Sequence, residues 1–161
     1  MDADYNNDLE DRRSRSGILV YLGNSPIIWA SRKQHCNVIS TTEAEYVALA
    51  LCAQEVRWAR QLLEELGHPS PSPTPISEDN RGCWYLAVTG ASNPRTKHID
   101  IRHHFIRDYI AKGICNVIQC GSMQQLADIF TKGVDPEQFN RCRTALRLVS
   151  NVARGGIGSD A

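Results

Sequence analysis

Residues 40–49 read STTEAEYVAL and open the longest stretch of the chain that has a helical pattern. Ser40 is followed three residues later by Glu43, which is the spacing of a capping box at the start of a helix. No glycine or proline then interrupts the chain until Gly67, a residue type at which helices commonly end. The stretch therefore predicts one long helix from about Ser40 to Leu66, around which the rest of the chain is arranged.

The two glutamates in this stretch, Glu43 and Glu45, are predicted to point in different directions, because each helical residue is rotated by about 100° from the last. Positions in line with Glu45 are apolar and those in line with Glu43 are polar: Leu49, Cys52, Val56, Ala59 and Leu63 against Gln54, Arg57, Gln61 and Glu64. Glu45 is thus expected to face the core, where a carboxylate is costly unless a metal ion or a buried base pairs with it. The alternative is that Thr42 and Glu45, which have the same spacing, form the cap.

Length and composition predict a single domain. The chain has 161 residues, of which 42% are apolar, and this is enough for one core but short for two. We expect the domain to span residues 1–149 and a disordered Gly-rich tail to follow at 150–161. No apolar run approaches the roughly 20 residues of a membrane span, and the acidic start at residues 1–4 is unlike a signal peptide. We therefore expect no membrane partner.

The charge balance and the cysteines bear on two kinds of function, nucleic-acid binding and zinc binding. Lysine plus arginine equals aspartate plus glutamate, so the chain has no overall field that would attract nucleic acid, and any such binding must use local clusters of arginine. The alternative for each cluster is an ordinary solvated surface. The six cysteines form no CxxC pair, so we expect reduced thiols and no zinc site.

Outside the long helix, the chain alternates between strand and helix patterns. Apolar runs at 18–22 and 27–30 flank a Gly-Asn-Ser-Pro turn and predict a β-hairpin. Ser122 with Gln125 predicts a second capping box, which would open a helix containing residues 126–130. The other predicted elements are a strand at 75–78, helices at 81–88 and 97–112, a strand at 114–120, and a last helix from Pro136 to about residue 149. This order predicts an α/β fold with helices packed on a mixed sheet.

Four carboxylates are distinguished by their place in these elements: Asp2 in the first strand, Glu45 on the inward helix face, Asp79 directly after a strand, and Asp128 early in a helix. Each also has a plain structural explanation. Asp2 would belong to a frayed terminus, and Asp79 would form a turn with Asn80. Asp128 would be a surface partner of Lys132, four residues further on.

Six segments surround these carboxylates in order: DADY at 2–5, SRSGILVYL at 14–22, STTEAEYVAL at 40–49, Asp79-Asn80, RTKHIDIRHHFIR at 95–107 and QLADIFTK at 125–132. Together they resemble the ribonuclease H domain of copia-type LTR retrotransposon polyproteins, over about residues 1–148. The resemblance implies a ribonuclease H-like mixed five-stranded sheet, an antiparallel hairpin followed by parallel strands, flanked by helices. Because Met1 directly precedes Asp2, the first strand is expected to be truncated.

The resemblance also implies a site and its chemistry. The catalytic and metal-binding residues of the family correspond to Asp2, Glu45, Asp79 and Asp128. They would hold two Mg²⁺ ions, for which Mn²⁺ can substitute, because hard cations prefer carboxylate oxygens. Such a pair of ions activates a water and stabilises the leaving oxygen of a phosphodiester.

The implied substrate is the RNA strand of an RNA–DNA hybrid, which is cut during reverse transcription. The domain would distinguish RNA from DNA by the 2′-OH groups and by the shape of the groove. Candidate contacts to the nucleic acid are Asn80, Arg95, Lys97 and Arg102. The implied partners are the reverse transcriptase and integrase portions of the same polyprotein, and the implied location is a cytoplasmic virus-like particle, with the nucleus as an alternative.

One departure from the family concerns a histidine. Cellular ribonucleases H place a mobile histidine in the loop before the last aspartate, but residues 120–123 contain none, which leaves His98, His103 and His104 as candidates. The alternative function is a catalytically weak or silent retrotransposon-derived fragment that only binds nucleic acid or a protein partner. An integrase of the same broad fold is disfavoured, because it would need a different spacing of acidic residues.

Overall fold

The computed structural model describes residues 1–5, 12–35, 38–90 and 100–148, with residues 100–104 described by their backbone alone. Its elements are β1 (Asp2–Asp4), β2 (Arg15–Leu22), β3 (Ser25–Lys33), α1 (Thr41–Glu65), β4 (Thr74–Glu78), α2 (Arg81–Thr89), α3 (Asp100–Ala111), β5 (Cys115–Gln119), the 3₁₀ helices η2 (Ser122–Gln124) and η3 (Leu126–Phe130), and α4 (Pro136–Ala145). The order confirms the predicted α/β class, with the long helix and the hairpin where they were expected.

The strands have the predicted directions but are divided between two sheets. β1, β2 and β3 form an antiparallel sheet in that order, and β4 and β5 form a parallel pair. β1 pairs with β2 over only three residues, from Asp2 opposite Gly17 to Asp4 opposite Arg15. On its other side, the amino group of Met1 donates to the carbonyl oxygen of Ser77 in β4 at 3.3 Å. β1 therefore reaches both sheets but is too short to join them into one.

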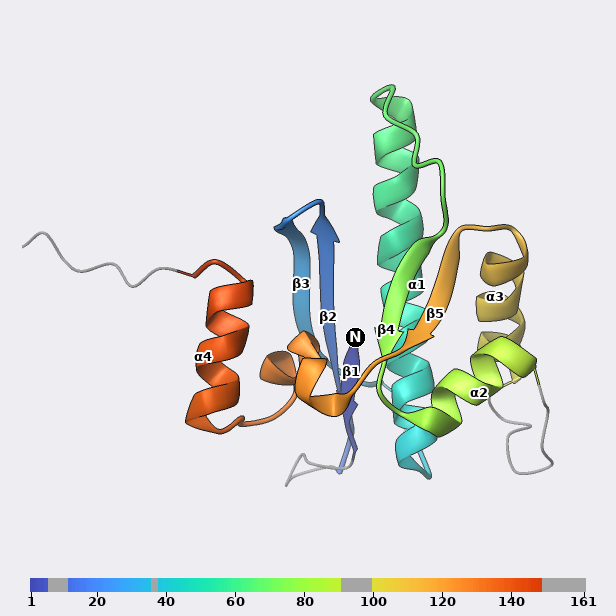
Figure 1. Cartoon of the computed structure of the whole chain (residues 1–161). Helices are drawn as coiled ribbons and strands as arrows, with labels where there is room; N and C mark the ends of the chain where they lie inside the picture. The colour runs from blue at the N-terminus through green and yellow to red at the C-terminus, as the bar shows by residue number, and fades with distance from the viewer. Residues whose placement is uncertain (6–11, 36–37, 91–99, 149–161) are drawn as a thin grey trace, which may run out of the picture.

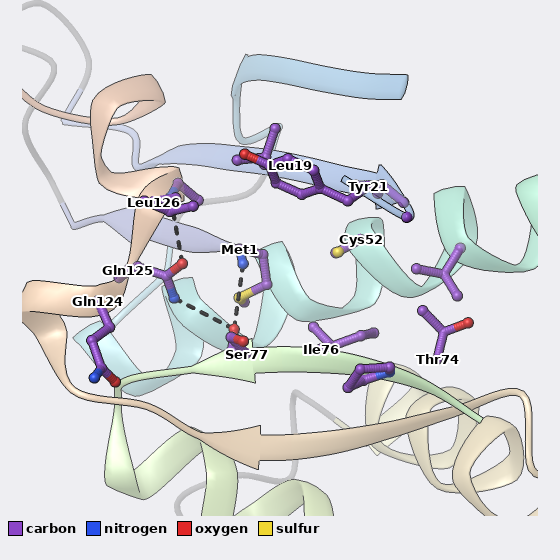
Figure 2. A pocket seen from close by; sticks show the side chains of 15 residues that line it. Met1, Leu19, Tyr21, Cys52, Thr74, Ile76, Ser77, Gln124, Gln125 and Leu126 are labelled. Carbon is purple, nitrogen blue, oxygen red and sulfur yellow. Dashed lines mark hydrogen bonds between the residues drawn. The ribbon is translucent and has the colours of Figure 1, made fainter. Parts of the chain in front are cut away.

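A cavity of about 380 Å³ lies between the two sheets, next to Met1 (Figure 2). Leu19 and Tyr21 line it from β2, and Thr74 and Ile76 line it from β4. Moving back along β1 from Asp2 advances the pairing along β2 from Gly17 toward Leu19 and Tyr21. The cavity thus occupies the path that an extension of β1 beyond Met1 would follow.

The long helix α1 connects the two sheets. Its N-cap is Ser40, whose hydroxyl accepts the backbone N–H of Glu43 at 3.1 Å, while the carboxylate of Glu43 accepts the N–H of Ile39 at 2.7 Å. This assigns the cap to Glu43, as predicted, and leaves Glu45 for another role. The polar face predicted at Glu43 is wrong for that residue, because the cap buries its side chain, which is 4% exposed. The helix contacts β1, β2, β4, α2 and α3 (Figure 1), and its Tyr46 and Leu49 are fully buried.

The segment after β5 differs from the single capped helix that the sequence predicts. Instead of a box between Ser122 and Gln125, the side-chain oxygen of Gln125 accepts the N–H of Ala127 at 3.4 Å and starts η3. The side-chain amide of Gln125 also donates to Ser77 at 3.4 Å. Because Gln125 is held at β4, the chain turns in two short 3₁₀ helices. The last helix, α4, begins at Pro136 as predicted but ends at Ala145.

Two expectations from composition can be compared with the described residues. Cys52, Cys83, Cys115, Cys120 and Cys142 are free thiols, as predicted, and Cys36 lies outside the described part of the chain. None of the helices in the described ranges combines the length and apolarity that crossing a membrane requires. The expected tail at 150–161 also lies outside the described residues.

Candidate active site

Three of the four predicted carboxylates meet where the two sheets approach each other. Asp2 comes from β1, Glu45 from the first turns of α1, and Asp79 from the residue that follows β4. Each offers one oxygen, and these oxygens lie within 4.8 Å of one another. Asp2 and Glu45 are buried, with 2% and 6% of their surface exposed, while Asp79 is half-buried. Residues far apart in the sequence therefore form one acidic cluster with an open side at Asp79.

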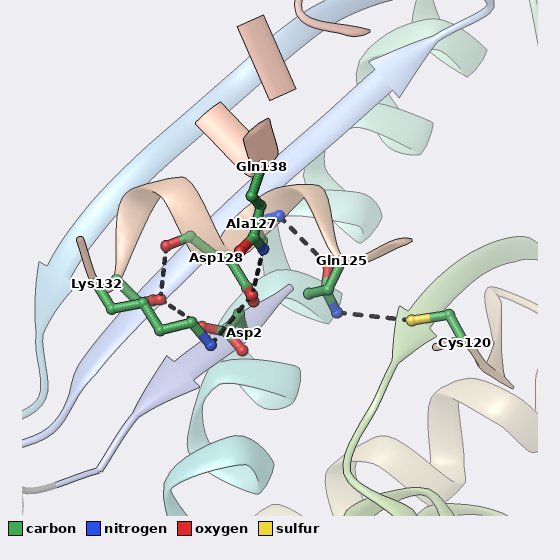
Figure 3. A network of polar contacts seen from close by, with 8 residues as sticks. Asp2, Cys120, Gln125, Ala127, Asp128, Lys132 and Gln138 are labelled. Atoms are coloured by element: carbon green, nitrogen blue, oxygen red, sulfur yellow. Dashed lines mark hydrogen bonds and ion pairs between the residues drawn. The ribbon is translucent and has the colours of Figure 1, made fainter. Parts of the chain in front are cut away.

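The fourth predicted carboxylate, Asp128, lies in η3 beside Asp2 but outside this group of three (Figure 3). It is 3% exposed, and its Oδ2 atom accepts the side-chain amide of Gln138 at 2.9 Å. The same oxygen pairs with the ammonium of Lys132 at 3.1 Å. The predicted ion pair between Asp128 and Lys132 is thus present, but the Asp128 carboxylate is buried next to the cluster, whereas the side chain of Lys132 is 41% exposed.

Burial and mutual repulsion favour the protonated forms of these carboxyl groups in the metal-free chain. Burial, followed by the carboxylates of Glu78, Asp2 and Asp79, raises the pKa of Glu45 to about 10. Burial is also the main reason why the pKa of Asp2 is raised to about 6, with Asp128 adding to it and a hydrogen bond from the Thr131 hydroxyl opposing it. Glu45 therefore keeps its proton at neutral pH unless a cation replaces it, whereas Asp2 is mostly ionised there.

Glu78 is a fifth acidic residue at the site, and the sequence analysis missed it. Its side chain is fully buried, burial raises its pKa to about 7, and its Oε1 atom accepts the backbone N–H of Asn80 at 2.9 Å. The alternation of side chains between the two faces of strand β4 could have identified Glu78 as buried. Ile76 and Glu78 are two apart in a strand, so they share a face, and Ile76 is plainly apolar.

Of the four predicted nucleic-acid contacts, Asn80 is the one whose side chain the structure describes. Its side-chain oxygen caps α2 by accepting the N–H of Cys83 at 3.0 Å, and it lies 3.4 Å from the hydroxyl of Thr42. Asn80 thus fixes the turn that presents Asp79. Arg95 and Lys97 lie outside the described residues, as do the side chains of Arg102, His103 and His104 and all of His98.

The donor set suits a hard divalent cation. Carboxylate oxygens are the ligands that Mg²⁺ and Mn²⁺ prefer. The Oε2 atom of Glu45 is buried and has no hydrogen-bond partner among the described residues, although unpaired polar atoms are costly in a protein interior. The unpaired oxygen of Glu45, beside the carboxylates of Asp2 and Asp79, thus fits coordination of a cation.

The sequence is similar to parts of three long plant proteins. It is 41% identical over 138 residues to the retrovirus-related Pol polyprotein from transposon RE1 of Arabidopsis thaliana, and 42% identical over 138 residues to that from transposon RE2 of the same plant. It is 33% identical over 150 residues to the retrovirus-related Pol polyprotein from transposon TNT 1-94 of Nicotiana tabacum. The chain is thus homologous to a segment of transposon Pol polyproteins. No family model and no solved structure matches it.

The similarity to the Pol polyproteins covers most of this chain and little of theirs. The matches include 86% of the chain for the two Arabidopsis proteins and 93% for the tobacco protein. They cover 9%, 10% and 11% of those proteins, respectively. The Pol homology therefore assigns the chain to a retrotransposon-derived region, and the chemistry of that region has to be argued from the acidic cluster.

Proposed function

We propose that this chain is a ribonuclease H domain, a metal-dependent endonuclease that hydrolyses the RNA strand of RNA–DNA hybrids during retrotransposon reverse transcription. The observation that carries the proposal is the meeting of Asp2, Glu45 and Asp79 within 4.8 Å, from β1, α1 and the end of β4. Homology to Pol polyproteins, together with the resemblance in the six sequence segments, favours this reaction over other uses of a carboxylate site.

In this proposal Asp2, Glu45 and Asp79, together with Asp128 beside Asp2, would hold two divalent cations. The chemistry that a bound cation supplies is activation of water and stabilisation of the leaving 3′ oxygen. The chain's own groups orient the ligands: the hydroxyl of Thr131 donates to Asp2, and the cap made by Asn80 fixes the backbone that follows Asp79. The half-buried side chain of Asp79 marks the side from which the hybrid would approach.

The hybrid and the other Pol portions are partners in this proposal. Asn80 lies next to Asp79 and is placed to contact a phosphate near the scissile bond. Arg95, Lys97 and Arg102 are proposed to bind the backbone of the hybrid, whose affinity would then fall as salt is raised. The reverse transcriptase and integrase portions of a polyprotein would deliver the substrate within a cytoplasmic particle.

The alternative, a weak or silent fragment that only binds nucleic acid, is favoured by one observation. β1 spans three residues, so Asp2 is held by a short strand. A ligand displaced by about 1 Å can reduce a rate on the order of a hundredfold. The same substrate distinguishes the two possibilities, because a silent fragment binds the hybrid without cutting it.

The test is cleavage of an RNA–DNA hybrid whose RNA strand carries a fluorescent label. We expect products with Mg²⁺ or Mn²⁺, none with excess EDTA, and none from double-stranded DNA. Asp79→Asn should abolish cleavage while circular dichroism is unchanged, because the amide keeps the volume but not the charge that a dication needs.

Asp135→Asn is the matched control. Asp135 is exposed and caps α4, and asparagine caps helices as well as aspartate, so this variant should cut normally. Full activity of Asp79→Asn, or cutting that persists in EDTA, would refute the proposal. Binding of the hybrid without cleavage by the wild-type chain would favour the silent fragment.

A further inference from the structure

The two oxygens of the buried Asp128 carboxylate have different surroundings. Oδ2 accepts the side-chain amide of Gln138 at 2.9 Å and pairs with the ammonium of Lys132 at 3.1 Å (Figure 3). Oδ1 is also buried, but it has no hydrogen-bond partner among the described residues. A buried carboxylate oxygen without a donor is costly. Oδ1 of Asp128 and Oε2 of Glu45 are thus two acidic oxygens, one on either side of Asp2, for which the described chain provides no donor.

Gln138 contacts Asp128 from a separate element, the first turn of α4. Its backbone N–H donates to the side chain of Asp135, the N-cap of that helix, at 2.9 Å, and Pro136 is the first helical residue. Gln138 itself is buried, with 9% of its surface exposed. Because an ionised carboxylate can only accept hydrogen bonds, the amide nitrogen of Gln138 is the atom that faces Asp128. The start of α4 therefore places one neutral donor against one oxygen of Asp128.

Lys132 contacts the same oxygen but constrains it less. The side chain of Lys132 is 41% exposed, and lysine carries its ammonium on a flexible four-carbon stem. It also lies only four residues after Asp128, whereas Gln138 is buried and follows ten positions later, in another helix. The contact from Gln138 is thus the one that ties the orientation of the Asp128 carboxylate to the packing of α4.

We propose that Gln138 is a positioning residue, which holds Oδ2 of Asp128 so that Oδ1 stays available to a divalent cation beside Asp2. This inference rests on the proposed function and deepens it, because it adds a residue of α4 to the four carboxylates. Side chains that hydrogen-bond to a metal ligand orient that ligand, and their loss typically lowers metal affinity about 10–100-fold. An amide suits this position because it donates a hydrogen bond without adding a positive charge that would repel the cation.

The test measures the affinity of the whole chain for Mn²⁺ by electron paramagnetic resonance at pH 8, without nucleic acid. Gln138→Met removes the amide and keeps the length of the side chain. We expect the dissociation constant of at least one bound ion to rise about 10–100-fold. In an Asp128→Asn background the same change should cause no further rise, because Gln138 acts through Asp128.

Gln61→Met is the matched control. The amide of Gln61 donates to the carboxylate of Glu65 at 3.1 Å, but this contact is exposed and lies in the second half of α1. The variant should bind Mn²⁺ as the wild type does. It shows whether loss of a hydrogen bond between an amide and a carboxylate is enough to change the affinity.

A folded Gln138→Met that binds Mn²⁺ as tightly as the wild type would show that Gln138 only contributes to packing, and would overturn the inference while leaving the proposed function intact. An equal rise with and without Asp128→Asn would overturn it as well. If Gln138→Met does not fold, Gln138→Asn replaces it, because the shorter side chain withdraws the amide from Asp128. No Mn²⁺ bound by the wild-type chain would refute the metal site of the proposed function, and the inference with it.

Discussion

The buried carboxyl of Glu45 predicts that the metal-free protein becomes less stable as the pH rises. Its pKa is raised to about 10 from an ordinary value of 4.5, first by burial and then by Glu78, Asp2 and Asp79. Between these two values the unfolded chain has released the proton and the folded chain has kept it. The folded state then binds more protons than the unfolded state, so the free energy of unfolding falls with increasing pH.

The size of the effect follows from the pKa values. One group that behaves in this way changes the free energy of unfolding by about 1.4 kcal/mol per pH unit. From pH 5 to pH 7, Glu45 alone should remove about 3 kcal/mol. Glu78 and Asp2, with pKa values raised to about 7 and about 6, act in the same direction over the lower part of that range. This is a large share of the roughly 5–15 kcal/mol that stabilises a typical domain.

Urea unfolding in EDTA at pH 5, 6, 7 and 8 measures the dependence. Glu45→Gln should reduce the slope by about 1.4 kcal/mol per pH unit, because glutamine has no proton to release. Glu43→Gln should leave the slope in place, since Glu45 is retained, and should cost about 1 kcal/mol or less, because a glutamine oxygen can still accept at the cap. A wild-type stability that is flat or rises over this range, or a slope abolished by Glu43→Gln, would refute the assignment of Glu45 to the interior.

Three further predictions follow from particular contacts. Fusing about four β-forming residues before Met1 should extend β1 into the adjoining cavity, and both the melting temperature and the Mg²⁺-dependent cleavage rate should rise; equal values would contradict this. Gly17→Ala should cost about 1–3 kcal/mol in urea unfolding, because the new Cβ would lie 2.7 Å from a backbone oxygen of η3, whereas Gly133→Ala, in open space, should show no such clash. Thr131→Val should raise the pKa of Asp2 above about 6 in a carbon-13 NMR titration, because it removes the opposing hydrogen bond; a lower midpoint would exclude that role.

Helical periodicity and the capping pattern separated the roles of Glu45 and Glu43 but not their exposure. The apolar line through Glu45 is buried as predicted, but Glu43 is also buried, with 4% of its surface exposed, because its carboxylate folds back onto the N–H of Ile39 at the cap. The hairpin was equally predictable, because its two apolar runs flank turn residues. Local sequence determines these features, and that is why they could be predicted without a structure.

Features that depend on distant contacts could not be predicted in this way. The conformation of residues 122–130 depends on Gln125, whose side-chain amide donates to the carbonyl oxygen of Ser77, 48 positions earlier in the chain. The spacing of Asp128 and Lys132 predicted their ion pair, but not that the carboxylate of Asp128 would be buried beside Asp2. Whether the five strands form one sheet or two likewise depends on the length of β1. A strand of three residues is too short to show a periodic pattern in the sequence.

The acidic cluster depends on residues that a ribosome makes at very different times. Asp2 is made early, whereas its hydrogen-bond donor Thr131 follows 129 positions later, and the partner of Met1 in β4 follows 76 positions later. At roughly 5–20 residues per second, Thr131 emerges on the order of ten seconds after Asp2. Contacts of such long range form late in folding. A nascent chain that stops short of η3 therefore lacks both Asp128 and Thr131, so the proposed site would be complete only after synthesis has passed β4, β5 and η3.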